Sequence, residues 1–478
     1  ASQDRISQAD ILGHSVVVLC GGSLTEAIAI NKMCRSQSPS PCFVWGDTRG
    51  VEAMIFNDFG EKFTILDSDG ENPRNWMVSN VTQDANGGVV SVTEESHVDL
   101  AVGDTVVFSG VDGMVELMKT EHIVKELSNS KYEFRIATDT SKFTLFGNTG
   151  NVTEVKKPVV HHFDPLEKAV AESGTIEASD FAKEGRQYLL LLCYRAMWKF
   201  TEAHGGSLPR THNDEDADEM LKIVTQMNAD LAEKIRLAKI DEQMVRDFSF
   251  TCRGKLSPMD TAIGGVLCQE VLKACTFKFT PFRQWFFFDA QEVLPDSKTP
   301  RASFQPIGSR YDAQIAVLGR DLQERIEKLR YFLVGAGAIG CEVLKVWAMM
   351  GLGVGKNGMI HITDMDVIER SNISRQFLFR ESDIEHLKSE TAANAVKQMN
   401  PGVHISSYAL CVGRESENVY NEDFYASLDG VCTALDNFQA RRYVDQQCVT
   451  QGKPMIDSGT LGAKGNTQVI VPGLTESY

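Results

Sequence analysis

The sequence predicts an α/β protein built on doubly wound sheets, with a small β-barrel and a helical bundle inserted between the α/β parts. Three observations lead to this fold class. Strands and helices alternate at both ends of the chain, short β-type runs separated by turns fill residues 67–159, and helical periodicity dominates residues 160–253. Alternating strands and helices are typical of parallel sheets. At 478 residues, the chain is also too long for one ordinary domain.

The first half of the chain contains three of these parts. In residues 1–66, apolar strands such as "SVVVLC" alternate with one helical stretch, from Leu24 to Arg35. Residues 67–159 carry turn signals such as "DANGG" and "VDG" at short intervals, which predict the barrel. In residues 160–253, one helical run ends in a glycine pair suited to a C-cap, and the next opens with acidic residues that favour a helix N-terminus.

The rest of the chain returns to α/β patterning. Residues 254–300 hold a helix rich in small residues and the aromatic strand "RQWFFFDA". Residues 301–478 then alternate regularly, with strands at "YFLV", "MIHITD", "LDGVCTALDN" and "PMIDSG" separated by helical stretches. This alternation predicts a parallel, doubly wound sheet.

An internal repeat relates the two α/β regions. In each, a strand leads into a helix that ends near a cysteine (Cys34 or Cys448), and a further strand ends in T-x-G. Aligning the two cysteines places the Asp436–Asn437 pair opposite Gly22 and Ser23. Chance similarity between two α/β units is the alternative. A genuine repeat would pair one copy without this carboxylate with one copy equipped for chemistry.

Composition disfavours several classes of function. The net charge is −17, with 48 basic against 65 acidic residues, and a surface so negative repels nucleic acid. No apolar run reaches the roughly 18 residues that a membrane span needs, so we expect no membrane partner. The eleven cysteines are scattered without a C-x-x-C pair, which disfavours a zinc knuckle and fits a reducing compartment.

A glycine-rich turn follows the apolar run that starts at Tyr331. Gly335, Gly337 and Gly340 have G-x-G-x-x-G spacing, which indicates a helix N-terminus awaiting an anion. The next strand ends at Asp364, which can accept hydrogen bonds from ribose hydroxyls. These features fit NAD and ATP equally, and a tight turn without any ligand is the third alternative.

Charged residues further along the chain distinguish the two nucleotides. Arg375 and Lys388 follow the second strand, and a triphosphate needs more cations than the diphosphate of NAD. Asp436 ends the strand "VCTALDN", and Mg²⁺ prefers one or two carboxylates together with phosphate oxygens and waters. The alternatives are solvated surface charges and an aspartate that caps the following helix. Taken together, the residues favour ATP·Mg²⁺ over NAD.

Long strings of the sequence closely resemble the ubiquitin-activating enzymes, among them "FLVGAGAIGCEVLK", "ITDMDVIERSNISRQFLFR" and "DSGTLGAKGNTQVIVPGLTESY". The resemblance covers nearly the whole chain and implies Rossmann-like adenylation domains of the ThiF and MoeB type. It identifies five parts. These are a truncated inactive adenylation half (1–66), a β-rich insertion of the first catalytic-cysteine half-domain type (67–159), a helical bundle (160–253), the closing segment of the inactive half (254–300) and a truncated active adenylation domain (301–478).

The resemblance also implies a ligase reaction. The C-terminal glycine carboxylate of ubiquitin attacks the α-phosphate of ATP, which gives an acyl-adenylate and pyrophosphate. A cysteine then takes the acyl group as a thioester and passes it to a ubiquitin-conjugating enzyme. The implied cofactors are ATP and Mg²⁺. The implied partners are ubiquitin and, through domains outside this chain, conjugating enzymes. A monomer located in the cytoplasm and nucleus is expected.

The family's roles transfer onto matching residues of this chain. Arg375, Lys388 and Asp436 are implied to be catalytic, the last as the Mg²⁺ ligand. The nucleotide-binding set adds the glycines Gly335, Gly337 and Gly340, Ala338 against the nucleotide, Asp364 on the ribose with Asp366 beside it, Asn372 and Gln376 on phosphates together with Arg375 and Lys388, and Asn437 next to the metal.

Some features depart from the family pattern. Ser374 stands where the family usually has a second asparagine in S-N-L-N-R-Q. We expect the R-Q segment of the inactive half to lie upstream of Ala1 and the P-x-C-T thioester cysteine downstream of Tyr478, so both ends are expected to be truncated. None of the eleven cysteines is then the nucleophile.

Two other functions stay open, a non-catalytic module that binds ubiquitin or a partner and an NAD-linked oxidoreductase. A closely related modifier is a further alternative, although the single-chain layout favours ubiquitin.

Overall fold

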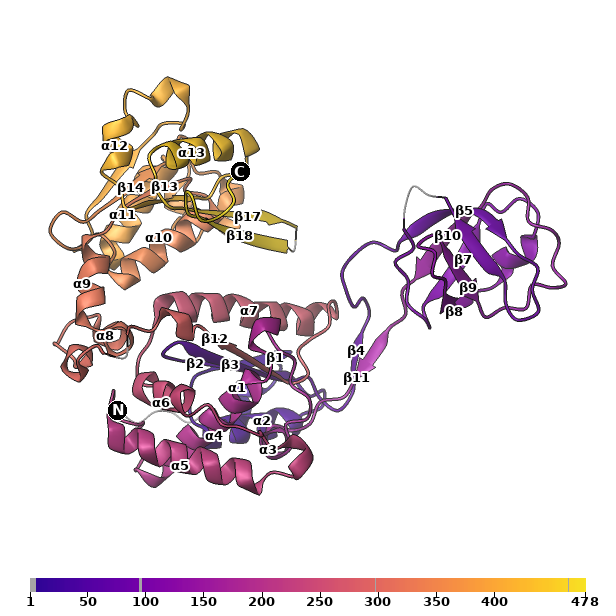
Figure 1. Cartoon of the computed structure of the whole chain (residues 1–478), viewed down its shortest axis with the longest axis horizontal. Helices are drawn as coiled ribbons and strands as arrows, with labels where there is room; N and C mark the ends of the chain where they lie inside the picture. Colours follow the sequence, from indigo (N-terminus) through magenta and orange to yellow (C-terminus); the bar gives the residue numbers. More distant parts are fainter. Residues whose placement is uncertain (1–5, 94–96, 297, 463) are drawn as a thin grey trace.

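The computed structural model describes residues 6–93, 97–296, 298–462 and 464–478. Two α/β units lie next to each other, and a separate barrel projects from the first of them (Figure 1). The predicted fold class is confirmed, including the closed barrel and the helical bundle. None of the helices in the described ranges is long and apolar enough to cross a membrane.

The first α/β unit is a four-stranded sheet with helices on both faces. Its strands are, in order across the sheet, β1 (Val16–Cys20), β2 (Cys42–Arg49), β3 (Glu52–Asp58) and β12 (Trp285–Asp289). Only β1 and β2 are parallel, so this sheet is mixed. Successive side chains of β2 enter different cores, because side chains alternate along a strand. Val44 packs with residues of α7 (Ser257–Thr276), and Trp45 packs with residues of α4 (Arg186–Ala203).

Helices α3 (Leu166–Ala171), α5 (Asp214–Asp230) and α6 (Glu242–Thr251) lie with α4 in residues 160–253, where the sequence predicts a helical bundle. Helices α1 (Gln8–Ile11) and α2 (Leu24–Arg35) belong to the N-terminal α/β part of this unit. Helix α5 begins after Asn213, whose side chain accepts a hydrogen bond from the Asp216 amide at 2.9 Å. Three acidic residues fill its first turn, where they complement the helix dipole as the sequence predicts.

The barrel closes on itself and has its own hydrophobic core. Its strands are β5 (Asn75–Val81), β6 (Val89–Val92), β7 (Thr105–Ser109), β8 (His122–Leu127), β9 (Glu133–Ile136) and β10 (Asn151–Val155), joined in the order β10-β5-β6-β9-β8-β7. A two-stranded stalk of β4 (Phe63–Ile65) and β11 (Val159–His161) connects it to the first unit (Figure 1). Both chain crossings between the barrel and the rest of the molecule therefore run through one narrow link.

The second α/β unit is a six-stranded, doubly wound sheet. Across the sheet its strands are β15 (Ile405–Tyr408), β14 (Met359–Thr363), β13 (Arg330–Val334), β16 (Gly430–Thr433), β17 (Met455–Leu461) and β18 (Lys464–Ile470). The first five are parallel and β18 is antiparallel. Along the chain, β14 and β15 are added on one side of β13, and β16 and β17 then follow on its other side. The switch point of this sheet, where such folds bind ligands, therefore lies between β13 and β16.

Helices cover both faces of this sheet and link it to the first unit. They are α8 (Asp312–Leu318), α9 (Arg320–Lys328), α10 (Ala338–Met350), α11 (Lys388–Met399), α12 (Glu422–Ala426) and α13 (Phe438–Thr450). Helix α10 contacts α7, and one hydrophobic core runs through both units at this place (Figure 1). Short 3₁₀ turns complete the chain: η1 (Val115–Lys119), η2 (Phe181–Lys183), η3 (Glu233–Ile235), η4 (Gln291–Val293), η5 (Arg301–Phe304), η6 (Arg370–Ser374), η7 (Glu381–Asp383) and η8 (Arg414–Ser416).

The predicted internal repeat is confirmed by strand register. In the first unit, Leu19 of β1 pairs with Trp45 of β2. In the second unit, the equivalent Thr433 of β16 pairs with Asp457 of β17. The following helices also begin at equivalent places, since Ser23 caps α2 and Asn437 caps α13. The strand register and the helix caps both match, which a chance similarity between two α/β units would not produce.

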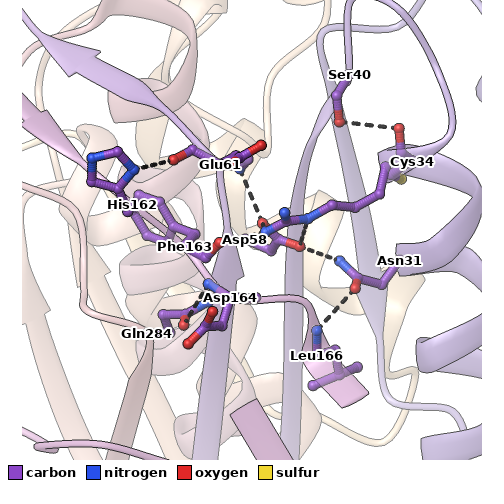
Figure 2. A network of polar contacts seen from close by, with 12 residues as sticks. Asn31, Cys34, Ser40, Asp58, Glu61, His162, Phe163, Asp164, Leu166 and Gln284 are labelled. Atoms are coloured by element: carbon purple, nitrogen blue, oxygen red, sulfur yellow. Dashed lines mark hydrogen bonds and ion pairs between the residues drawn. The ribbon is translucent and has the colours of Figure 1, made fainter. Parts of the chain in front are cut away.

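A polar network fastens the returning chain to the first unit (Figure 2). The buried Asp58 carboxylate, at the end of β3, accepts hydrogen bonds from Asn31 Nδ2 at 2.7 Å and from Arg35 Nε at 2.8 Å. The side-chain oxygen of Asn31, Oδ1, in turn accepts a hydrogen bond from the Leu166 amide at 2.9 Å. The chain that leaves the stalk is thereby tied to α2 and β3.

Replacing Asp58 by alanine is expected to destabilise this unit by about 3 kcal/mol, because it leaves a largely buried guanidinium without its carboxylate. Urea unfolding monitored by circular dichroism measures this loss. Glu61→Ala is the matched control, since Glu61 is exposed and only its backbone carbonyl contacts His162. Equal stabilities of the two variants would contradict the assignment.

Glu52 gives the first unit a pH-dependent stability. Its side chain in β3 is fully buried, and among the described residues its Oε2 atom has no partner. Burial raises the pKa of the Glu52 carboxyl to about 8. Since the folded state favours the protonated form, this contribution to stability is full below the unfolded pKa and is lost as pH rises toward 8. We expect Glu52→Gln to flatten the decline in unfolding free energy between pH 5 and pH 8; an unchanged slope would count against this origin.

Candidate functional site

A cavity of about 890 Å³ opens at the carboxyl edge of the second sheet. It lies beyond the ends of β13, β14, β16 and β17, which places it over the switch point. Eleven of the twelve residues predicted as a site line this cavity: Gly335, Gly337, Ala338, Asp364, Asp366, Asn372, Arg375, Gln376, Lys388, Asp436 and Asn437. Residues separated by about a hundred positions in the chain therefore meet in one place.

The twelfth residue, Gly340, lies behind the turn and is not among the residues that line the cavity. A Cβ atom at Gly340 would lie 2.2 Å from the carbonyl oxygen of Gly335. Gly335 itself has φ +105°, and a Cβ atom there would lie 2.6 Å from the Ala434 carbonyl oxygen. These two glycines allow the turn to pack closely against β16 and α10. Gly337 has open space where a Cβ would stand, and it faces the cavity.

The Asp364 carboxylate organises the glycine turn. It accepts hydrogen bonds from the Ala336 amide at 2.7 Å and from the Asp366 amide at 2.9 Å. Each carboxylate oxygen has a second lone pair, so Asp364 can still accept hydrogen bonds from a ligand. The turn delivers the N-terminus of α10 to the cavity, with its free backbone amides and the positive end of its dipole.

Lys388 is held in place by an acidic neighbour. It starts α11 with its side chain only 11% exposed, and its Nζ lies 2.8 Å from Asp366 Oδ2. The Lys388 amide also donates to the Asp366 carbonyl at 2.9 Å. The sequence resemblance places Asp366 beside Asp364 at the ribose; in the structure Asp366 lines the cavity and its carboxylate pairs with Lys388. A fixed ammonium group at the cavity wall is suited to an anionic ligand.

The 3₁₀ turn η6 contributes Asn372, and the two residues that follow the turn are Arg375 and Gln376, which were also predicted. Asn372 is buried and accepts a hydrogen bond from the Glu369 amide at 3.0 Å, which shapes the turn. Gln376 is only 4% exposed, and within the described residues its Oε1 atom has no partner. Arg375 is exposed, and among the described residues its guanidinium donates only to the Ser371 carbonyl, at 2.9 Å. Most of its donors thus stay available to a ligand in the cavity.

Asp436 and Asn437 divide two tasks between them. The N-cap of α13 is Asn437, whose side chain accepts a hydrogen bond from the Ala440 amide at 3.0 Å. The alternative in which Asp436 caps this helix is therefore wrong. Asp436 is exposed at the cavity wall, and the described part of the chain offers its carboxylate no hydrogen bond or ion pair. A carboxylate without a structural partner is suited to a cation.

The cavity also contains residues that the sequence analysis did not select. Arg441 lies one helical turn after Asn437, and this spacing could have indicated that its side chain lies near the end of β16. Lys464 and Asn466 come from the β17–β18 hairpin, whose position over the cavity depends on sheet order rather than on local sequence. Lys464 pairs with Glu71 at 3.0 Å, but both side chains are mostly exposed, so this pair contributes little.

Two buried cysteines of the second unit, Cys341 in α10 and Cys432 in β16, have the properties of structural residues. Burial raises the pKa of the Cys341 thiol to about 11 and that of Cys432 to about 12. Thiols with such pKa values stay protonated at neutral pH and are weak nucleophiles. For these two residues, the structure agrees with the expectation that they do not form a thioester.

The donor set fits a phosphorylated ligand that brings a divalent cation with it. In the described ranges no group of three or more His, Cys, Asp or Glu side chains is placed to hold a metal by itself. Mg²⁺ does not require such a group, because it uses one or two carboxylates and completes its shell with phosphate oxygens and waters. The Asp436 carboxylate, which has no partner among the described residues, provides oxygen atoms on this cavity wall.

Comparison with known proteins agrees with this geometry. Residues 311–478 match the model of the ThiF family, residues 157–228 match the ubiquitin-activating enzyme E1 four-helix bundle, and residues 85–156 match the ubiquitin-activating enzyme E1 FCCH domain. The ThiF match contains the whole cavity described above.

Individual relatives match along almost the entire chain. Ubiquitin-like modifier-activating enzyme 1 of Dictyostelium discoideum is 48% identical over 97% of this chain and 45% of its own length. The human protein of the same name is 44% identical over 98% of this chain and 44% of its own length. Ubiquitin-activating enzyme E1 2 of Arabidopsis thaliana is 41% identical over 99% of this chain and 44% of its own length. The chain thus spans less than half the length of these relatives, and along almost its whole length it is similar to the ubiquitin-activating E1 enzymes.

Proposed function

We propose that the cavity binds ATP with Mg²⁺ and that the chain serves the adenylation of ubiquitin. The observation that carries this proposal is the convergence of Arg375 and Lys388 with the partner-free Asp436 carboxylate over the switch point. A dinucleotide site needs few cations, because a helix N-terminus suffices for a diphosphate. Two cationic side chains and one carboxylate on the wall of the same cavity instead match a triphosphate accompanied by a metal ion.

The residues of the chain would divide the work of binding. The α10 N-terminus and the glycine turn receive phosphate oxygens through backbone amides. The ion pair with Asp366 restrains the Lys388 ammonium at the cavity wall, so little entropy is lost when it binds a phosphate. Arg375 offers two parallel donors, which suits a phosphate that gains charge during the reaction. Asp364 accepts hydrogen bonds from the ribose while it supports the turn.

Mg²⁺ would be held by Asp436, with Asn437 beside it at the start of α13. When bound, the ion neutralises phosphate charge and orients the leaving pyrophosphate. In the proposed reaction, a carboxylate oxygen of the ubiquitin C-terminal glycine bonds to the α-phosphorus and the bond to the β-phosphate breaks. Transfer to a cysteine and then to a conjugating enzyme, action as a monomer, and location in cytoplasm and nucleus are proposed by analogy with the relatives.

Charge-removing variants test the phosphate assignment. We expect Arg375→Gln and Lys388→Gln each to weaken ATP binding about tenfold or more, because each removes a charge-assisted hydrogen bond. Titration calorimetry with ATP and Mg²⁺ measures the affinity. Arg370→Gln is the matched control, since this exposed arginine lies on the same 3₁₀ turn but not on the cavity wall. Equal affinities of all three variants and the unaltered chain would contradict the assignment.

The same titration separates the other functions. An NAD-linked oxidoreductase would bind NAD and be indifferent to Arg375 and Lys388. A non-catalytic module would bind ubiquitin while failing to bind ATP. We expect the unaltered chain to bind ATP with Mg²⁺ and not NAD.

A further inference from the structure

Arg441 anchors the backbone that carries Asp436. Its Nε donates to the carbonyl oxygen of Leu435 at 3.2 Å, and its Nη2 donates to the same oxygen. Leu435 directly precedes Asp436, so the guanidinium restrains the peptide from which the carboxylate extends. Arg441 Nη2 also donates to the Ser458 carbonyl at 3.2 Å. One side chain of α13 thereby connects the end of β16 to β17.

The charge of Arg441 is already matched inside the protein. Its Nη1 lies 3.1 Å from Asp457 Oδ2, and the Asp457 side chain is only 3% exposed. Asp457 also accepts hydrogen bonds from the Tyr478 hydroxyl, at 2.8 Å, and from the Thr433 hydroxyl. A guanidinium held by a buried carboxylate and two backbone carbonyls is oriented by the protein and not directed at a ligand.

The surrounding backbone is shaped to receive this guanidinium. A Cβ atom at Gly459 would lie 2.7 Å from Arg441 Nη2 and 2.9 Å from Nη1. Any side chain at this position of β17 would therefore displace the guanidinium from the Leu435 and Ser458 carbonyls. Because Gly459 has no side chain, the Arg441 guanidinium can lie against both carbonyls.

The first repeat holds the equivalent carbonyl in a different way. Gly21, which the repeat aligns with Leu435, accepts a hydrogen bond from Trp45 Nε1 at 2.6 Å. Trp45 occupies the register position of Asp457, and Ala27 occupies the position of Arg441. The copy without a carboxylate at position 22 thus uses one neutral indole, whereas the copy with Asp436 uses a largely buried ion pair.

Stability alone does not account for this difference. A buried ion pair rarely stabilises a fold more than well-packed apolar residues, because both charges must leave water. The indole of Trp45 holds the same carbonyl without that cost. The ion pair occurs in the copy where the next side chain is a carboxylate on the cavity wall.

We infer that Arg441 and Asp457 are positioning residues that set the direction of the Asp436 carboxylate toward the divalent cation of the nucleotide. This inference rests on the proposed function. Mg²⁺ demands nearly ideal octahedral geometry, so a ligand that swings on a loose strand end binds it poorly. Groups that orient a metal ligand typically affect metal affinity by 10- to 100-fold without touching the ion.

The test uses Arg441→Lys in the full chain. Lysine keeps a positive charge beside Asp457, so the buried carboxylate stays paired, but one ammonium group cannot serve the Leu435 and Ser458 carbonyls in the geometry of the guanidinium. We expect ATP affinity measured by calorimetry with Mg²⁺ to fall on the order of 10-fold. Affinity measured with a chelator in place of Mg²⁺ should be unchanged. Arg442→Lys, at the exposed neighbouring position of α13, is the matched control.

Thermal unfolding guards against a merely structural effect. We expect Arg441→Lys and Arg442→Lys to unfold within a few degrees of the unaltered chain. If Arg441→Lys lowers chelator-measured and Mg²⁺-dependent affinities equally, the guanidinium contacts the nucleotide itself and the positioning role is overturned. Asp457→Asn gives a second, independent variant, because it removes the charge that orients Arg441 while it keeps the side-chain size.

A double-mutant cycle gives the sharpest outcome. If Arg441 acts through Asp436, then adding Arg441→Lys to Asp436→Ala causes no further loss of Mg²⁺-dependent ATP affinity. Losses that add independently overturn the inference and leave the proposed function standing. An unaltered chain that shows no ATP binding at all contradicts the proposed function, and the inference with it.

Discussion

Replacing Asp436 by alanine is expected to abolish the enhancement of ATP binding by Mg²⁺. The carboxylate is exposed to the cavity and has no structural partner in the described chain, while Asn437 caps α13. Its removal should therefore leave the fold intact and take away the one carboxylate proposed for the cation. Calorimetric titration with ATP, with and without Mg²⁺, measures the effect, which we expect to reach at least 10-fold.

Asp423→Ala provides the control for this variant. Asp423 is an exposed carboxylate in the first turn of α12, in the same unit but away from the cavity wall. It changes net charge by the same amount, so any general electrostatic effect on ATP binding would appear in both variants. A Mg²⁺ enhancement that survives Asp436→Ala would show that another group holds the cation.

Two substitutions in the glycine turn are expected to have large effects, one on stability and the other on ATP binding. In Gly340→Ala the new methyl group would lie 2.2 Å from a backbone carbonyl, so the turn must move and the second unit should lose several kcal/mol of stability. In Gly337→Ala the methyl group meets no protein atom within 4 Å. That variant should fold normally but bind ATP more weakly, since the methyl group enters the space that the phosphates need.

Urea unfolding and ATP titration of both variants separate these effects. The expected pattern is low stability for Gly340→Ala, and normal stability with weakened binding for Gly337→Ala. If Gly337→Ala bound ATP as tightly as the unaltered chain, the phosphates would not pass over this part of the turn.

Much of this site is predictable from the sequence because its parts lie at the ends of strands. The carboxyl ends of neighbouring parallel strands meet at one sheet edge, so Gly335, Asp364 and Asp436 were expected to converge. Arg375 and Lys388 followed from the charge of a triphosphate. The closed barrel followed from short strands and frequent turns, and the bundle from helical periodicity.

Other features depend on tertiary contacts that local patterns do not contain. The pairing of Asp366 with Lys388 requires α11 to begin beside the β14 end, which only the folded sheet brings about. The choice of Asn437 over Asp436 as helix cap is undetermined in sequence, because both residue types are good caps. Arg441 and Lys464 reach the cavity through the helix and hairpin that follow β16. The first sheet is mixed because β2 and β3 form an antiparallel hairpin, and its fourth strand, β12, comes from a distant part of the chain to pair with β3.

The most direct test of the central claim is a pair of calorimetric titrations of the unaltered chain. One uses ATP in the presence of Mg²⁺, and the other uses NAD under the same conditions. We predict saturable binding of ATP at a single site, which weakens when a chelator removes the cation, and no binding of NAD. Binding of NAD in preference to ATP, or ATP binding that is indifferent to Mg²⁺, would contradict the account.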